Sequence, residues 1–278
     1  MRMKYCVKYC VKPGEGARAS ALPVRLLDMT LDNLDESACV RHVMDALRQG
    51  RGGWIVTANV DILRRHTRDP QFRRLAAGAS LVVADGMPLV WASRLRGTPL
   101  PQRVTGSNLV LTLSAAAAAA GRSIFLVGGA PGMAERAAQV LLEAQAGLRL
   151  AGPPFPLPCF DGDPAQLASL RAALAAARPD IVYVALGSPK QECLIGALRR
   201  AFPQTWWIGI GISFSFLAGS VRRAPAWLQN AGLEWLHRLI QEPRRLARRY
   251  LLHGIPFALY LLASALGWRL RQRLGARP

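Results

Sequence analysis

The sequence has 278 residues, 51% of them hydrophobic, and carries a formal net charge of +19. This length accommodates one large α/β domain with an appendage, or two small domains, and the hydrophobic content argues against a disordered chain. So high a charge indicates a partner of opposite charge, such as nucleic acid, an anionic membrane or a polyanionic substrate.

The cysteines argue against a disulfide framework or a zinc site, and the first residues of the chain argue against a secretory signal. The five cysteines are odd in number and no two have C-x-x-C spacing, so we expect neither a disulfide framework nor a zinc site. Residues 1–20 contain no apolar run long enough for a secretory signal, and we interpret them as a flexible extension.

Between residues 54 and 210 the chain alternates apolar runs with alanine-rich segments of helical type. Each apolar run is short and apolar on both faces, as strands buried in a parallel sheet are. The alternation predicts an α/β fold, a Rossmann-like parallel sheet with helices on both faces. The predicted strands are 54–58, 81–84, 123–127, 181–186 and 206–210, and the predicted helices are 60–77, 88–95, 108–120, 132–146, 164–177 and 189–201.

Polar or glycine-rich residues lie at the end of each predicted strand or directly after it. In parallel α/β sheets ligands bind at the carboxyl ends of the strands, so these groups are expected to converge on one edge. They are Thr57 and Asn59, Asp85-Gly86, residues 128–132, residues 187–192, and residues 209–211.

Asp85 has two interpretations that its position leaves even. An aspartate shortly before Pro88 suits the start of a helix, where its side chain would cap the first turn. The same carboxylate at the edge of the sheet suits a general base whose pKa is tuned by partial burial.

Two basic residues near the strand ends also have plain and functional interpretations. Arg103 precedes a predicted helix, and taken alone it is better explained as a solvated loop arginine than as a sugar or diphosphate clamp, although guanidinium groups match phosphate oxygens. Lys190 falls in the first turn of a predicted helix, where a positive charge opposes the helix dipole. That placement hints at a nearby anion, and a surface lysine is the plain alternative.

The glycine-rich turn at 128–132 and the Asp161-Gly162-Asp163 run are weak signals. The turn lacks the Walker lysine and the G-x-G-x-x-G fingerprint, although a helix start there can hold an anion. The acidic run precedes Pro164 and is better explained by turn chemistry than by metal–diphosphate binding. The four histidines have no ligand spacing with acids or cysteines, so we predict no metal and no cofactor.

The character of the chain changes after about residue 222. From Arg238 onward Glu242 is the only acid, and arginines flank an apolar stretch at 251–268. This stretch is borderline for a membrane span, which needs ~20 residues, and it contains Gly254 and Pro256. A helix lying in an anionic membrane surface fits better than a span. Because no nucleic-acid motif accompanies the arginines, a membrane is favoured over nucleic acid.

Short motifs in a fixed order along residues 24–250 resemble the WecG/TagA/CpsF family of glycosyltransferases, glycosyltransferase family 26. Each motif alone is weak, but their number and order make the resemblance specific. They are Thr57-Ala58-Asn59, Ala84-Asp85-Gly86, Arg103-Val104-x-Gly106, Phe125-Leu126-x-Gly128-Gly129-x-Pro131-Gly132-x-Ala134-Glu135, Gly187-x-Pro189-Lys190-Gln191-Glu192, Arg223-Ala224-Pro225 and Gly232-Leu233-Glu234-Trp235-x-x-Arg238-Leu239-x-x-Glu242-Pro243-x-Arg245.

The resemblance implies an inverting, metal-independent transferase, of hexosyl or N-acetylmannosaminyl type, with Asp85 as the catalytic base. It would move a sugar from a UDP-sugar to a polyprenyl-diphosphate-linked saccharide, as in the synthesis of exopolysaccharide, teichoic-acid linkage units or common antigen. The substrate-binding residues would be Thr57, Asn59, Arg103, Lys190 and Gln191 in the core, with Arg238, Arg245 and Arg248 facing the acceptor diphosphate.

Composition, charge placement and the resemblance together predict three parts: an extension over 1–20, a catalytic core over 21–222 and a helical, membrane-associated appendage over 223–278. The enzyme would be peripheral at the cytoplasmic face of the plasma membrane. An appendage that must reach an active site is also compatible with assembly as a homo-oligomer.

The chain departs from the family pattern at Ser215, where members usually carry aspartate in Gly-x-Gly-x-x-Phe-Asp. This substitution puts in doubt any nucleotide recognition carried over from that carboxylate. The rival hypotheses are an inactive membrane-surface adaptor on the same fold and a nucleotide-sugar-modifying enzyme. The retained Asp85, Arg103 and Gln191 argue against the adaptor, and the missing dinucleotide fingerprint argues against the modifying enzyme.

Overall fold

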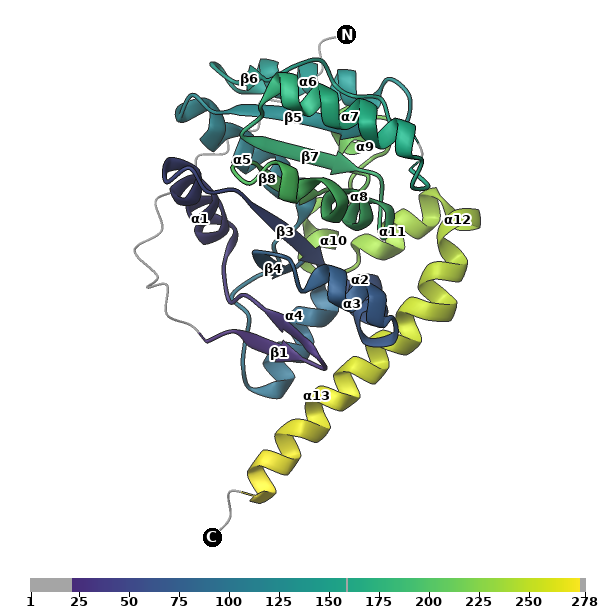
Figure 1. Ribbon diagram of the computed structural model, residues 1–278. Helices are drawn as coiled ribbons and strands as arrows, with labels where there is room; N and C mark the ends of the chain where they lie inside the picture. The colour runs from purple at the N-terminus through teal and green to yellow at the C-terminus, as the bar shows by residue number, and fades with distance from the viewer. Residues whose placement is uncertain (1–21, 159, 276–278) are drawn as a thin grey trace.

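The computed structural model describes residues 22–158 and 160–275. The predicted extension at 1–20 lies outside the described residues. At the centre is a six-stranded, wholly parallel sheet with the order β4-β3-β8-β7-β5-β6 (Figure 1), and all five predicted strands belong to it. The strands are β3 (Gly53–Ala58), β4 (Leu81–Ala84), β5 (Ser123–Gly128), β6 (Arg149–Leu150), β7 (Ile181–Ala185) and β8 (Trp206–Gly209).

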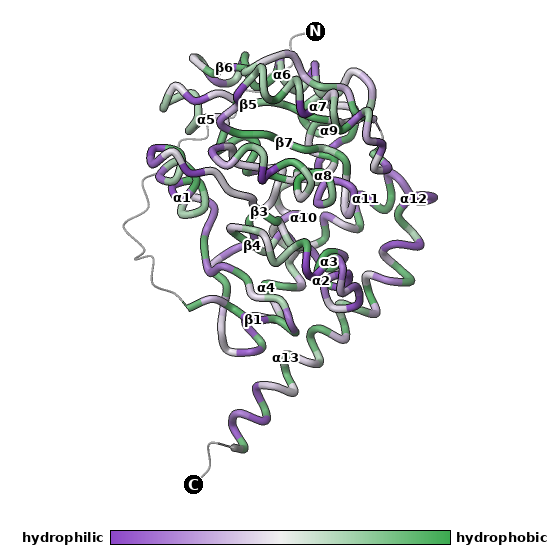
Figure 2. Tube along the Cα trace, viewed as in Figure 1, coloured by the Kyte–Doolittle hydropathy of each residue, from purple (hydrophilic) through white to green (hydrophobic). Residues whose placement is uncertain are grey.

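Helices cover both faces of the sheet and form two separate cores, as the alternation predicts. One core lies under α1 (Glu36–Arg48), α5 (Gly106–Ala119), α6 (Met133–Ala144) and α9 (Ser213–Leu217). The other lies under α2 (Val60–Arg68), α3 (Pro70–Ala76), α4 (Met87–Arg96), α7 (Pro164–Ala177) and α8 (Lys190–Leu198), which a 3₁₀ turn over Arg199–Ala201 extends. The hydropathy colouring in Figure 2 shows the strands as the apolar layer between them.

Two helix starts settle questions raised by the sequence. The segment predicted as one helix over 60–77 is two helices, because Asp69 ends α2 and its carboxylate accepts hydrogen bonds from the first turn of α3 at Pro70. Asp163 is the N-cap of α7 and accepts from the Ala165 N–H at 2.9 Å. The turn interpretation of Asp161-Gly162-Asp163 is therefore confirmed.

A short antiparallel hairpin, β1 (Val24–Leu26) and β2 (Met29–Leu31), precedes the sheet and was not predicted. It is fastened to the edge of the sheet beside β4. The Asp32 N–H donates to the Val82 carbonyl at 2.7 Å, and the Val82 N–H donates to the Asp32 carboxylate at 2.7 Å. The edge strand β4, at whose end Asp85 stands, is thus held from both sides.

The chain after residue 222 forms a run of helices that crosses the site edge of the core and then runs along it (Figure 1). The crossing begins at Gly232, whose φ is +74° and where an added Cβ would meet Met87 at 2.8 Å, so only glycine fits. The elements are α10 (Ala226–Asn230), α11 (Glu234–Gln241), α12 (Pro243–Ala247), a π-helical segment η2 (Arg248–Gly254) and α13 (Ile255–Gly275).

The last helix buries one stripe and exposes the other. Phe257, Leu261 and Ala265, four residues apart, are buried against the core that includes α4. Arg96 of α4 lies over the Trp268 ring, 4.1 Å from its centroid. Large apolar side chains are exposed away from this stripe on α13 and on η2 before it, namely Leu251, Leu252, Leu259, Tyr260, Leu266, Leu270 and Leu274.

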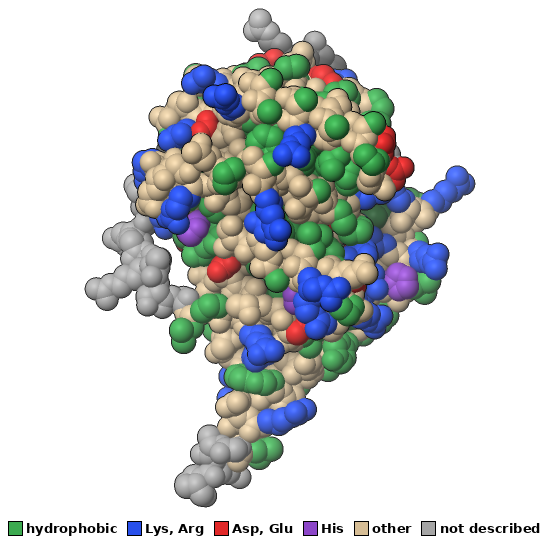
Figure 3. Space-filling model, in the orientation of Figure 1, with side chains coloured by type: hydrophobic (Ala, Val, Ile, Leu, Met, Phe, Trp, Pro, Cys, Tyr) green, Lys and Arg blue, Asp and Glu red, His purple; other side chains and the backbone are tan. Residues whose placement is uncertain are grey.

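The helical stretch Pro243–Leu274 is long and apolar enough to cross a membrane, with 17% of its most apolar window buried. The buried stripe of α13 packs along α4, so the exposed apolar side chains of this helix face away from the core. Figure 3 shows hydrophobic and basic side chains next to one another along this tail.

Candidate active site

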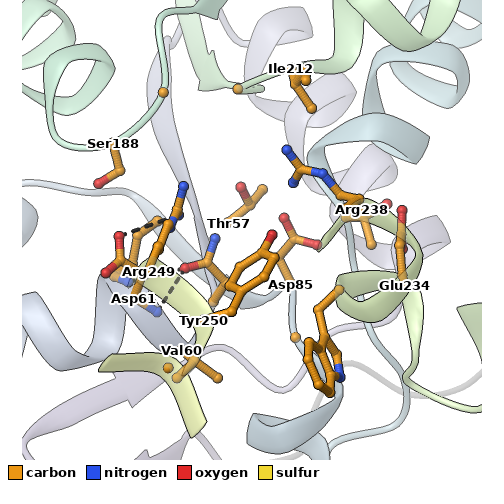
Figure 4. A pocket seen from close by; sticks show the side chains of 18 of the residues that line it. Thr57, Val60, Asp61, Asp85, Ser188, Ile212, Glu234, Arg238, Arg249 and Tyr250 are labelled. Carbon is orange, nitrogen blue, oxygen red and sulfur yellow. Dashed lines mark hydrogen bonds and ion pairs between the residues drawn. The ribbon is translucent and has the colours of Figure 1, made fainter. Parts of the chain in front are cut away.

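A cavity of about 300 Å³ lies at the carboxyl ends of β3, β4, β7 and β8, between the core and the appendage. Thr57, Asn59, Asp85 and Gln191 all line it, so the predicted convergence of strand ends is confirmed. The appendage forms the facing wall with Glu234, Trp235, Arg238, Arg245, Arg249 and Tyr250 (Figure 4).

Asp85 stands at the end of β4 with its carboxylate in the cavity. Its N–H donates to the Ala58 carbonyl at 2.7 Å, which continues the pairing of β4 with β3. The helix that follows has Gly86 at its N-cap position and no side-chain cap bond, so the interpretation of Asp85 as a helix cap is wrong.

The surroundings of Asp85 raise its pKa to about 7. Burial is the largest cause, because the charged form loses water, and the nearby Glu234 carboxylate acts in the same direction. The Arg103 and Arg223 guanidinium groups and the Gly106 N–H act against them. A carboxyl group with this pKa exchanges its proton readily near neutral pH.

Arg103 lies in a half-buried ion cluster, so its interpretation as a solvated loop residue is wrong. Its guanidinium donates to the Glu234 carboxylate at 2.7 Å, and the two side chains are 15% and 16% exposed. Arg223 approaches the other oxygen of Glu234 at 3.6 Å and the Thr105 hydroxyl at 3.5 Å. Glu234 and Arg223 belong to the motifs shared with the family, but no site role was predicted for either residue.

Thr57 and Asn59 place polar groups on the β3 side of the cavity. The Thr57 hydroxyl donates to the Gly209 carbonyl of β8 at 3.4 Å. The Asn59 side-chain oxygen caps α2 by accepting from the Asp61 and Ile62 N–H groups at 3.0 and 3.1 Å. The amide nitrogen of Asn59 is therefore the group left to donate to a ligand.

Gln191 is held in one orientation against β8. Its carbonyl oxygen accepts from the Gly211 N–H at 3.1 Å, and its amide nitrogen donates to Glu192 at 2.9 Å. A Cβ on Gly209 would meet that nitrogen at 2.5 Å, so the amide lies flat on the strand because the strand has a glycine there. Burial raises the pKa of the Glu192 carboxyl. Lys190, by contrast, is exposed and does not line the cavity.

On the appendage, the predicted Arg238 and Arg245 line the cavity, whereas Arg248 is exposed and does not line it. Its neighbour Arg249 takes the inward position and pairs with Asp61 of α2 at 3.3 Å, the ion pair dashed in Figure 4. Neighbouring residues of a helix point in different directions around its axis, and the sequence alone does not show which of these two arginines faces the core.

A second, more open cavity adjoins the first and shares Gly187, Gly211, Ile212 and Arg245 with it. Gly129 and Ala130 of the glycine-rich turn line it, together with Ser215, the residue that departs from the family pattern. The two cavities form a path from the glycine-rich turn at the end of β5 to Asp85 at the end of β4.

The chain is similar to a described protein family and to known proteins. A family profile described as "Glycosyl transferase WecG/TagA/CpsF family" matches residues 24–271. One similar protein is the N-acetylglucosaminyldiphosphoundecaprenol N-acetyl-beta-D-mannosaminyltransferase of Bacillus spizizenii (strain ATCC 23059 / NRRL B-14472 / W23). It is 32% identical over 227 residues, a match that covers 81% of this chain and 85% of the relative.

The raised pKa of Asp85 predicts a pH-dependent stability. The folded state binds this proton with a pKa of about 7, against 3.8 in the absence of the fold, so the wild type loses stability as the pH rises between these values. Asp85→Asn removes the effect. Between pH 5 and pH 8 the wild type should lose about 2–3 kcal/mol of unfolding free energy relative to this variant.

Denaturant unfolding at the two pH values measures this difference. Asp161→Asn, on an exposed turn, is the matched control and should follow the wild type. An Asp85→Asn protein whose stability changes with pH as the wild type's does would contradict the shifted pKa.

Proposed function

The chain belongs to the WecG/TagA/CpsF family of glycosyltransferases, and on this basis we propose that it moves a sugar from a UDP-sugar to a polyprenyl-diphosphate-linked saccharide, with inversion and without a metal. The observation that carries the proposal is Asp85, a carboxyl group with a pKa of about 7 at the meeting point of the sheet edge and a basic appendage.

Asp85 acts as the general base in a single displacement. The acceptor hydroxyl oxygen attacks the anomeric carbon of the donor, and the bond from that carbon to the diphosphate oxygen breaks. The proton of the hydroxyl passes to Asp85, while UDP leaves with the bonding electrons. Attack from the face opposite the leaving group inverts the anomeric configuration.

The donor occupies the path formed by the two cavities. We place its sugar among Thr57, Asn59 and Gln191, whose orientations are fixed by hydrogen bonds, and its nucleotide towards the glycine-rich turn and Ser215. Positive charge for the departing diphosphate comes from Arg238 and Arg245, which line the cavity.

The acceptor enters from the appendage. Arg245 and Arg249 offer guanidinium groups to its diphosphate, and the cavity wall then becomes apolar at Tyr250, Ile255 and Ala258. These residues lead to the exposed apolar face of the tail helix, which gives the polyprenyl chain a continuous path towards lipid. The relative from Bacillus spizizenii carries a diphosphoundecaprenol acceptor and N-acetylmannosamine in its name, so UDP-N-acetylmannosamine is the first donor to test.

We propose that the enzyme is attached by its appendage to the cytoplasmic surface of the plasma membrane. Exposed leucines and neighbouring arginines supply insertion and attraction to anionic lipid together, the two signals that stable attachment requires. Because Phe257, Leu261 and Ala265 hold the helix along the core, we favour a helix lying in the interface over one that spans the bilayer.

The role of Asp85 predicts a large and selective loss of turnover. Asp85→Asn keeps the shape but cannot accept the proton, so UDP release in the presence of a short-chain polyprenyl-diphosphate saccharide should fall by about 10²–10⁴-fold. Donor affinity, measured by calorimetry, should stay within a few-fold of the wild type. Asp161→Asn serves again as control, and near-normal turnover by Asp85→Asn would rule out this base.

The membrane placement predicts that attachment and chemistry can be separated. Leu252, Leu259 and Leu266 are 66%, 62% and 47% exposed, and their joint replacement by glutamine should weaken flotation with anionic liposomes about ten-fold or more. Turnover of a soluble, short-chain acceptor should persist. Leu142→Gln, an exposed leucine on α6, is the control. Undiminished flotation of the triple variant would refute the role of this face.

A further inference from the structure

Glu234 stands out because it is a carboxylate from the appendage that pairs with Arg103 of the core. It begins α11, yet its two oxygens meet Arg103, from the loop before α5, at 2.7 Å and Arg223 at 3.6 Å. Both arginines also act on Asp85, as does Glu234 itself. Two carboxylates and two guanidinium groups therefore share one half-buried site with balanced charge.

The pairing within this cluster is unequal. Glu234 is in ion-pair contact with both arginines, closely with Arg103 and more loosely with Arg223, whereas no ion pair joins either arginine to the Asp85 carboxylate in the described part of the chain. Without Glu234 the cluster would keep two guanidinium groups and one carboxylate. A half-buried guanidinium is costly without a counter-ion, so Arg103 and Arg223 would turn to Asp85 as the remaining anion.

We propose that Glu234 is a positioning residue that occupies Arg103 and Arg223 and so leaves Asp85 unpaired and basic. This inference rests on the proposed role of Asp85 as the base. Since Glu234 belongs to the appendage, the base reaches its working state only when the appendage is docked on the core. The appendage then contributes to the chemistry through a buried charge, in addition to the arginines that line the cavity.

A merely structural role for Glu234 would have a different signature. As an acidic residue in the first turn of α11, it also stabilises the helix dipole and fastens the appendage through Arg103. Loss of that role alone would lower stability or activity by the same factor at every pH. A change in the charge around Asp85 would instead move the pH at which the base ionises.

The experiment is the pH profile of kcat/KM for UDP release with donor and short-chain acceptor. Both substrates carry diphosphate diesters that do not ionise near neutrality, so the acid limb reports the free enzyme. The wild type should show a limb near pH 7, the pKa of Asp85. Glu234→Gln should move it down by ~1 unit or more and lower the plateau, because a nearby arginine depresses a carboxyl pKa by that amount.

Arg223→Gln gives a prediction of opposite sign, because it removes a cation that lowers the pKa of Asp85. Its limb should move to higher pH. Glu234→Asp keeps the charge and should lie between the wild type and Glu234→Gln. Glu135→Gln, an exposed acid in the first turn of α6, loses the same helix-dipole contribution and should leave the limb in place.

The outcomes distinguish failure of the positioning role of Glu234 from failure of the proposed role of Asp85 as the base. If the limb stays in place in both Glu234→Gln and Arg223→Gln, or moves in the same direction in both, the positioning role is refuted. If Glu234→Gln does not fold, the direction of the Arg223→Gln shift, together with Glu234→Asp, still decides. A wild type without a limb near pH 7, or an active Asp85→Asn, would instead refute Asp85 as the base.

Discussion

The site depends on the balance of two carboxylates and two guanidinium groups at the wall of the cavity. Asp85 is enclosed enough to lose much of its hydration, and a lone charge in that position would simply take up a proton. Arg103 and Arg223 oppose that tendency, and Glu234 limits how far they do so. The four residues come from a strand end, a loop, the start of the appendage and its second helix. The fold is therefore required to bring together parts of the chain separated by more than a hundred residues, and the glycine crossing at Gly232 keeps the appendage close enough to do it.

The core could be predicted from the sequence because buried parallel strands are apolar on both faces and are separated by helical segments. What escaped prediction has identifiable causes. Strands β1 and β2 are three residues each, too short for a periodic signal. The helix α1 did carry a signal, since Asp35 accepts from the Ala38 N–H as its N-cap before apolar residues at helical spacing. The break between α2 and α3 follows from Asp69 and Pro70, whose effect on a helical pattern was available in the sequence.

The site was predictable where it follows strands and unpredictable where it depends on contacts across the chain. Thr57, Asn59 and Gln191 line the cavity because they lie at or just after the carboxyl ends of strands, which a parallel sheet brings to one edge. Arg103 taken alone looked like a solvated residue, because its partner Glu234 is 131 positions away. The inward-facing arginines of the appendage could not be predicted from the sequence either, although the candidates are direct neighbours in the chain. The composition marks the segment as basic, but the packing of the π-helical turn decides which guanidinium faces inward.

The helix that carries the exposed leucines is continuous with the segment that lines the cavity, and this continuity changes the kind of encounter by which substrate arrives. If the enzyme lies on the membrane as proposed, the enzyme and the lipid-linked acceptor occupy the same leaflet and meet by lateral diffusion. The rate of meeting then depends on the number of acceptor molecules per unit area of membrane. The donor still arrives from bulk water through the open second cavity. The rate of the reaction would thus depend on the surface density of the acceptor in the membrane and on the volume concentration of the donor in water.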